Sequence, residues 1–161
     1  MAVDFYLKID GIKGESKDST HSDEMQIQSW SWGESNSGSG TLGGGHGSGK
    51  VSMQDFHFVI DYGVHSPLLF KACAVGTHIP NAVLTCRKAG GDQVEYLTWK
   101  FTEVLISSYQ TGGSAHGAEL PTDQCSFNFT KIEMIYKEQK SDGSLGGNVN
   151  AGFDIKTNQA C

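Results

Sequence analysis

The sequence predicts a mainly β domain: a closed antiparallel β-barrel of two packed sheets, with one short α-helix and a long Gly/Ser-rich loop. Three observations support this fold class. Apolar and polar side chains alternate along most of the chain, which is the period of a half-buried strand. A helix signal occurs once, and two long strands change their buried face midway. The 161 residues suit a single domain, residues 1–161, which can bury about two-thirds of its unfolded surface.

The strands of the first half are read from this alternation. One face of the first strand carries Val3, Phe5, Leu7 and Ile9. A second strand is expected at residues 24–32, but Met25 and Ile27 share one face and Trp30 and Trp32 the other. Either a bulge near Gln28 or a strand buried on both faces would explain this change of phase. A third strand is expected at residues 50–62.

A short helix should follow the third strand. Ser66 suits the N-cap, Pro67 the first helical position and Gly76 the terminator. Its expected apolar stripe consists of Leu68, Leu69, Ala72 and Cys73. A helix of this kind should cover a sheet or one end of a barrel.

The second half should consist of strands. A hairpin is expected where residues 89–92 separate strands at 82–88 and 93–108, and further strands are expected at 124–137 and around 149–155. Two of these strands change phase: Leu97, Trp99 and Phe101 give way to Val104 and Ile106, and Phe127 and Phe129 give way to Ile132, Met134 and Tyr136. Long strands change their buried face in this way at the corners of barrels and orthogonal sandwiches.

Composition excludes several classes of function. The net charge of −6 disfavours a nucleic-acid or anionic-membrane partner, since both require a basic face. No apolar run approaches the roughly 18 residues of a membrane span. The alternating N-terminus does not resemble a signal peptide, so the protein is expected to start in the cytoplasm and to leave by a route that reads no such signal. In that compartment Cys73, Cys86, Cys125 and Cys161 should be reduced thiols.

Motifs for catalysis or cofactor binding are weak. Residues 38–43 match a dinucleotide-binding glycine pattern, and residues 44–50 nearly match a phosphate-binding loop, but neither opens a helix and Val51 stands where Ser or Thr belongs. The six histidines lack the spacing of a zinc site, and no Ser lies in a Gly-x-Ser-x-Gly elbow. The Asn128-Phe129-Thr130 glycosylation pattern falls within a strand. No enzyme, metal or cofactor is therefore predicted.

The segment from Gly33 to Gly49 is the most biased in composition, with 8 Gly and 4 Ser in 17 residues. It has only Leu42 as an apolar anchor, so it cannot pack on its own domain. Structureless loops of this length are usually functional or disordered. We therefore expect this loop to become ordered against another molecule, which favours an assembly protein over a catalyst.

Several segments, in the right order along nearly the whole chain, resemble the haemolysin-coregulated protein (Hcp) family, the tube subunits of type VI secretion systems. They are residues 2–16, Trp30-Ser31-Trp32-Gly33 before the Gly-rich loop, Lys50-Val51, residues 87–91, 94–97, 103–108 and 127–136. The resemblance implies a β-barrel with one helix that forms six-membered rings. These rings stack into a hollow tube, which is wrapped by a contractile sheath and tipped by a VgrG spike. It also implies release into target cells or the medium, with small effectors carried in the lumen of the ring.

The resemblance and the glycine content together predict two contact sites. The ring-stacking loop comprises Gly38, Ser39, Gly40, Thr41, Leu42, Gly43, Gly44, Gly45 and His46. Ser29 and Ser31 are the predicted lumen and effector contacts, with the flanking Trp30 and Trp32 buried on the opposite face. Some family members carry a toxin domain after the barrel, whereas this sequence ends at Cys161, which predicts a plain tube subunit. Cys161 is also expected to cross-link after release into an oxidising medium.

Two other classes of function fit parts of the sequence. A β-sandwich adhesin or carbohydrate-binding module would also use aromatic-rich strands and flexible loops, and it predicts a monomer or small oligomer. A hydrolase with a spatially assembled site predicts activity that is lost on a single Ser, His or Asp substitution. The mass of the protein in solution distinguishes the ring from the adhesin.

Overall fold

The computed structural model describes residues 2–37, 50–89, 91–117 and 119–161. Within them the chain forms one helix and twelve strands. These are β1 (Val3–Ile9), β2 (Met25–Ile27), β3 (Ser29–Ser31), β4 (Glu34–Asn36), β5 (Val51–Met53), β6 (Phe56–Asp61), α1 (His65–Val75), β7 (Ile79–Lys88), β8 (Glu95–Gly112), β9 (Thr122–Asn128), β10 (Lys131–Gln139), β11 (Leu145–Asp154) and β12 (Gln159–Ala160). The mainly β class, the antiparallel pairing and the helix are confirmed. No helix in the described ranges is long and apolar enough to cross a membrane.

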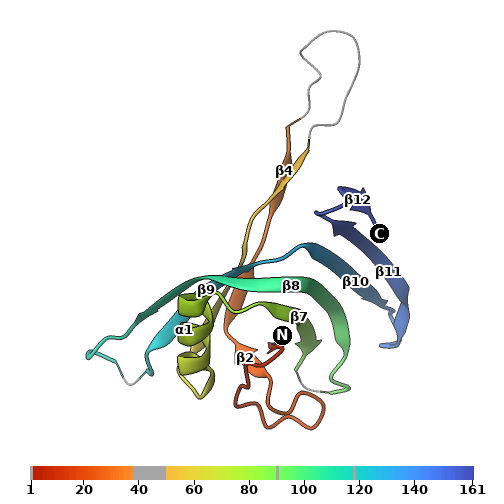
Figure 1. The fold of residues 1–161 in the computed structure, drawn as a ribbon. Coiled ribbons are helices and arrows are strands. Elements are labelled where there is room, and N and C mark those ends of the chain that lie inside the picture. Colours follow the sequence, from red (N-terminus) through yellow and green to blue (C-terminus); the bar gives the residue numbers. More distant parts are fainter. Residues whose placement is uncertain (1, 38–49, 90, 118) are drawn as a thin grey trace.

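Ten of the strands belong to one branched sheet. We call its main path, β12-β11-β10-β8-β7-β1-β2, sheet A. We call the branch β3-β6-β9 together with the second half of β8 sheet B. Strand β8 belongs to both, since residues up to 104 pair with β7 and residues from 105 pair with β9. The β4–β5 hairpin is separate and projects from the body (Figure 1).

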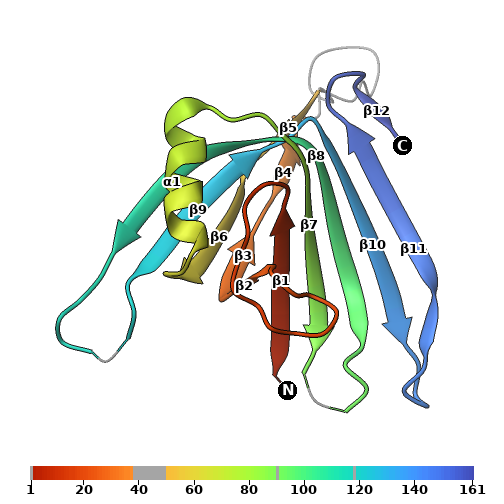
Figure 2. The ribbon, with the colours of Figure 1, turned by 60° about the horizontal axis from the view of Figure 1, so that its bottom comes forward.

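The described strands do not form the closed barrel that the sequence predicts. Strand β2 pairs with β1 in sheet A, and β3 pairs with β6 in sheet B, but no ladder joins β2 to β3. Gln28 lies between them, and its N–H donates to the carbonyl oxygen of Val59 at 2.8 Å. The strand expected at residues 24–32 is therefore two strands in different sheets, joined by a bend at Gln28, and neither the expected bulge nor a strand buried on both faces is present there. Strands β10–β12 extend beyond the core as a wing (Figures 1 and 2).

The two predicted corners are present. Within β8 the face changes at Glu103, which has a φ of 53°. The expected strand at residues 124–137 is two strands, β9 and β10, because the chain turns at Phe129–Thr130 from sheet B into sheet A. The Thr130 N–H donates to the Thr102 carbonyl at 2.9 Å, so both corners are held together. The expected strand at 50–62 is likewise divided, into β5 in the hairpin and β6 in sheet B.

The core lies between the two sheets and is largely aromatic. Phe56 packs against Phe127 and Phe101 with ring centroids 4.9 and 5.0 Å apart, and Phe101 packs against Phe129 at 5.1 Å. Phe56, Phe101 and Phe127 are essentially inaccessible to solvent. Aromatic pairs at these separations stabilise a core beyond the area they bury. This cluster fixes the angle between the two sheets.

The helix ends as expected but begins differently. Gly76 adopts the left-handed conformation, with φ 67°, and its N–H bonds to the Ala72 carbonyl. Val64 rather than Ser66 occupies the N-cap, and no side chain caps the helix there. Ser66 is instead buried, and its hydroxyl donates to Asp123 Oδ2 at 2.6 Å. Of the predicted stripe, Leu69 and Ala72 are buried, Cys73 is half-buried and Leu68 is exposed.

Candidate functional site

The outer face of sheet B, opposite the core, contains both residues predicted to contact cargo. Ser29 and Ser31 of β3 are exposed there. In the strand register, Ser31 is opposite His57 and His57 is opposite Ser126, while Ser29 is opposite Val59 and Val59 is opposite Gln124. Cross-strand neighbours on one face lie about 5 Å apart. The two serines therefore form the edge of a polar surface that continues across the sheet.

The far side of this surface is built by β9 and the second half of β8. Ser126 is opposite Ser108, and Gln124 is opposite Gln110. The hydroxyl of Ser126 lies 2.5 Å from Ser108 Oγ and 2.8 Å from Ser107 Oγ, and Ser107 donates to Asp55 Oδ2 at 2.6 Å. These contacts fix the hydroxyl groups at the shift in register between β8 and β9.

The chemistry of the face is that of neutral hydrogen-bonding groups. Its described strand residues are Ser29, Ser31, His57, Val59, Asp61, Thr122, Gln124, Ser126, Asn128, Leu105, Ser108, Gln110 and Gly112, of which only Val59 and Leu105 have large apolar side chains. None of them is Lys or Arg, and the carboxylates of Asp61 and neighbouring Asp55 lie at its ends. Such a surface can donate and accept hydrogen bonds to a polar partner, but it lacks the cations that phosphate recognition requires.

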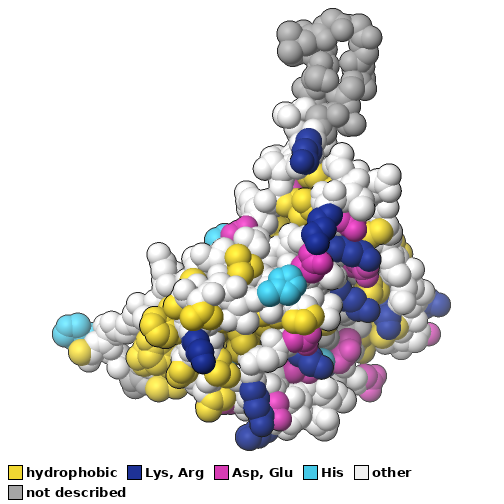
Figure 3. All heavy atoms as spheres, viewed as in Figure 1, with side chains coloured by type: hydrophobic (Ala, Val, Ile, Leu, Met, Phe, Trp, Pro, Cys, Tyr) yellow, Lys and Arg dark blue, Asp and Glu magenta, His cyan; other side chains and the backbone are white. Residues whose placement is uncertain are grey.

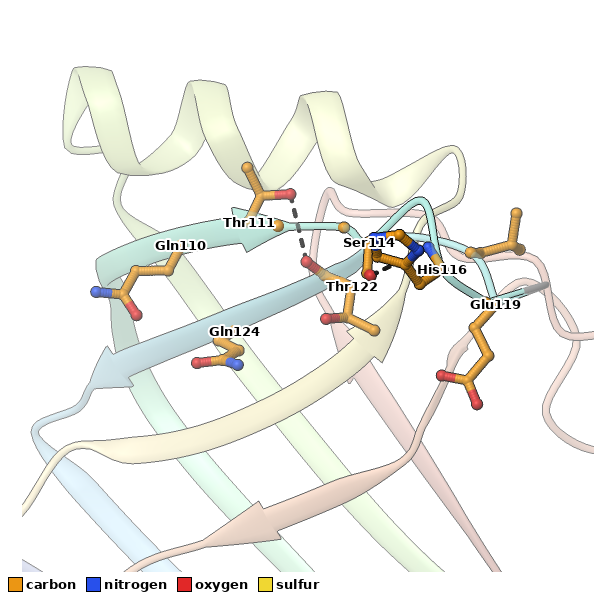
Figure 4. Close-up of a pocket in the computed structure, with 11 residues that line it drawn as sticks. Gln110, Thr111, Ser114, His116, Glu119, Thr122 and Gln124 are labelled. Carbon is orange, nitrogen blue, oxygen red and sulfur yellow. Dashed lines mark hydrogen bonds between the residues drawn. The ribbon is translucent and has the colours of Figure 1, made fainter.

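A hollow of about 910 Å³ lies at the end of this face, where the β8–β9 loop curves. Figure 4 shows Gln110 and Gln124 at one side of it and Ser114, His116 and Glu119 of the loop at the other, with Thr111 pointing toward α1. Thr111 Oγ1 donates to the Thr122 carbonyl at 3.3 Å, which holds the strands together at the base of the loop. The hollow is an open extension of the polar face.

The tryptophans beside the two serines hold β3 in place. Trp30 packs on Phe56 at 5.9 Å and against Phe5 at 6.2 Å. Trp32 packs on Trp99 at 5.5 Å, and its indole N–H donates to the Gln54 carbonyl at 2.8 Å. Both tryptophans are half-buried rather than buried, because the β4–β5 hairpin leaves the body immediately after Trp32.

The base of the predicted ring-stacking loop is the β4–β5 hairpin. Its register pairs Glu34 with Met53 and Asn36 with Val51. All of the residues predicted to make the stacking contact, 38–46, lie outside the described residues. The structure shows only that the hairpin that carries them projects away from both sheets (Figure 1).

A polar cluster on the opposite side of the molecule was not anticipated from the sequence. Buried Arg87 of β7 forms two hydrogen bonds to Asp18, of 2.8 and 3.0 Å, and donates to the Tyr6 hydroxyl at 2.8 Å. The Arg87 guanidinium, and next the Thr20 hydroxyl, hold the pKa of Asp18 far below its usual range. Burial is the main cause of the raised pKa of Tyr6. This cluster attaches residues 11–24 to sheet A.

The cysteines are all free thiols in this structure. Cys86 and Cys125 are buried, and burial raises the pKa of each to about 12. Neither is therefore a nucleophile at neutral pH. Cys161 is exposed at the C-terminus, and its predicted cross-linking after release remains a prediction.

Comparisons with known proteins agree with this architecture. Residues 6–136 match the family described as "Type VI secretion system effector, Hcp". The chain is 48% identical over 160 residues to Protein hcp1 of Pseudomonas aeruginosa, covering 98% of each chain. The chain belongs to the Hcp family of type VI secretion proteins. This is a family of secreted structural proteins and not of enzymes.

Solved structures of Hcp proteins share the fold. The chain is similar to Hcp1 from Salmonella typhimurium, with a TM-score of 0.82 and 35% identity over the full length of both chains. It is also similar to a structure described as a type six secretion system protein, with a TM-score of 0.94 and 28% identity over 99% of this chain and 100% of the other. A type VI secretion system effector from Yersinia pestis gives a TM-score of 0.77 at 36% identity, over 94% of this chain and 100% of the other.

Proposed function

We propose that this protein is the tube subunit of a type VI secretion system, and that it forms homohexameric rings that stack into a hollow tube. In this arrangement sheet B lines the lumen, Ser29 and Ser31 contact small effectors, and the β4–β5 hairpin points toward the next ring. The family also supplies the expected partners, which are a VgrG spike and contractile sheath subunits. The protein would be made in the cytoplasm and then released with the tube.

One observation supports the ring above all: in the described part of the chain, sheet B has two unpaired edges and one exposed face. Among the described residues, β3 pairs only with β6, and residues 105–112 of β8 pair only with β9. Unpaired strand edges are templates for pairing with another chain. If the β3 edge of one copy meets the β8 edge of the next, the contact is heterologous and closes into a ring by rotation.

The mass in solution tests the ring. Light scattering should give about six times the 17.3 kDa mass of one chain, and negative-stain images should show rings with a central hole. A monomer would contradict the proposal and would favour the adhesin alternative.

Stacking and cargo are tested by two further variants. Deleting residues 38–49 should leave soluble rings that no longer form tubes or support secretion, because the predicted stacking contact is lost.

Replacing Ser31 with Gln should reduce effector co-purification, since the larger side chain changes the polar face. Ser141→Gln, in the exposed β10–β11 turn, is the matched control. Normal tubes without the loop, or unchanged effector co-purification with Ser31→Gln, would contradict the respective assignment.

A further inference from the structure

Two exposed apolar surfaces lie at different ends of the folded molecule. The first, which we call the helix stripe, is on α1. Val64, Leu68 and Val75 are 54%, 39% and 65% exposed, and exposed Lys71 lies among them at helical spacing. Figure 3 shows hydrophobic side chains gathered over this end of the molecule. The helix stripe lies on a different side of α1 from Leu69 and Ala72, which pack into the core. Its Val64 and Leu68 also line a hollow of about 550 Å³ that residues of the 13–23 segment share.

The second surface, which we call the wing groove, lies between the β4–β5 hairpin and the β10–β11 wing. It has a volume of about 360 Å³, and its apolar lining includes Trp32, Val51, Met53, Trp99, Met134 and Phe153. The apolar face continues past the groove, where Tyr136 pairs with Val149 and both are exposed. The strands that carry its lining, in the β4–β5 hairpin and in β10–β11, lie at the end of the molecule away from α1 (Figures 1 and 2).

The two surfaces are complementary in charge. Of the described residues that line the groove, only Glu34 is charged. Lys71 is the only charged residue within the helix stripe. None of the ion pairs formed between described residues includes either side chain. A cation in the helix stripe and a carboxylate in the wing groove suit a contact with a fixed register.

We infer that α1 of one copy docks in the wing groove of the next copy, with the helix stripe against the groove lining and Lys71 against Glu34. This inference rests on the proposed ring. In that ring the edges of sheet B pair around the lumen, and the contact between α1 and the wing groove adds a second set of contacts further from the lumen. Two different surfaces at different ends of one molecule give a heterologous contact, which forms a ring when the rotation between copies closes. It also covers apolar area that a monomer would leave in water.

Chemical cross-linking tests the pairing directly. Val75→Cys and Met134→Cys are combined in one chain that also carries Cys73→Ala and Cys161→Ser. Cys86 and Cys125 can stay, because burial keeps their pKa near 12 and their thiols unreactive. A short bismaleimide should then give a ladder of covalent oligomers on a denaturing gel, ending at the number of subunits in the ring. Chains with only one of the two new cysteines should give no ladder.

Disruption gives a second readout. Val75→Glu and Met134→Glu introduce a charge at exposed positions, so they should fold normally but lower the mass in solution to that of smaller species. Val3→Glu is the control, since Val3 of β1 is 38% exposed and lies outside both surfaces and outside sheet B. A wild-type monomer would overturn the ring itself. Wild-type rings that give no ladder from the double-cysteine chain would overturn only the docking of α1 in the groove.

Discussion

The outward faces of the two sheets differ in burial. The buried polar groups of sheet A contribute to stability, whereas the exposed polar groups of sheet B can contact a partner. Over β1 and β7 of sheet A, the outward side chains of Tyr6, Thr85 and Arg87 are buried, although they point away from the core. On the outer face of sheet B, Ser29, Ser31 and His57 are exposed. Both faces carry polar groups, but among the described residues only the first is covered by another segment of the chain.

The cover on sheet A is residues 11–24, which we call the strap. Arg87 holds Asp18 of the strap, and His21 stacks on Tyr6 with ring centroids 4.5 Å apart. The two ring nitrogens of His21 lie 2.9 Å from Glu24 Oε2 and 2.7 Å from Glu95 Oε1. Polar groups buried in this way must be paired, because water no longer satisfies them. The strap cluster is therefore structural, whereas the exposed polar groups of sheet B, among them Ser29, Ser31 and His57, remain available to a partner.

The largest expected effect comes from removing the centre of the strap cluster. Arg87→Met should destabilise the protein by about 3 kcal/mol, because Asp18 would lose the charge that compensates it. Urea unfolding followed by tryptophan fluorescence measures this change. A loss under 1 kcal/mol would mean that the strap contributes as little as an exposed ion pair does.

A smaller loss is expected when the strap is pushed away from β2. A Cβ on Gly14 would lie 2.4 Å from the carbonyl oxygen of Glu24 and 2.7 Å from Met25 Cα, both of them backbone atoms. Gly14→Ala should therefore cost about 2 kcal/mol and increase proteolysis within residues 11–24. Gly147→Ala is the control, since a Cβ there meets nothing within 4 Å.

Acid should weaken the strap through Asp18. Its pKa is lowered in the folded protein, so the stabilisation is present above the pKa of the unfolded chain, near 3.9, and is lost as the pH falls further toward the folded value. The stability of the wild type should therefore decline more steeply below about pH 4 than that of Asp18→Asn. Parallel slopes in thermal melts between pH 5 and pH 2.5 would contradict this assignment.

The smallest effect on stability is expected on sheet B. His57→Ala and Gln124→Ala should each change the free energy of unfolding by less than about 0.5 kcal/mol, because both side chains are exposed and have no hydrogen-bond partner among the described residues. Effector co-purification should nevertheless fall if the polar face is a contact surface. A large loss of stability with either variant would mean that the polar groups on the outer face of sheet B are structural, as those of sheet A are.

Local sequence patterns predicted much of the secondary structure. The change of phase around Gln28 and the switches after Phe101 and Phe129 identified the points where the chain passes between sheets. These signals can be read from the sequence because side chains in a strand alternate between its two faces. A change of buried face therefore shifts the alternation of apolar and polar residues within a few positions. The N-cap was missed because Ser66, although well placed for capping, makes a stronger contact with Asp123, 57 residues away.

The sequence by itself determined the β class, the position of the helix, the corners and, through its motifs, the membership of the Hcp family. Only the tertiary structure decided which polar groups are buried and which are exposed to solvent. Arg87 and Asp18 are 69 residues apart, and no local period connects them. The helix stripe and the wing groove are likewise built from distant segments. Alternation determines which side chains share a face, but whether another part of the chain covers that face depends on how the sheets pack.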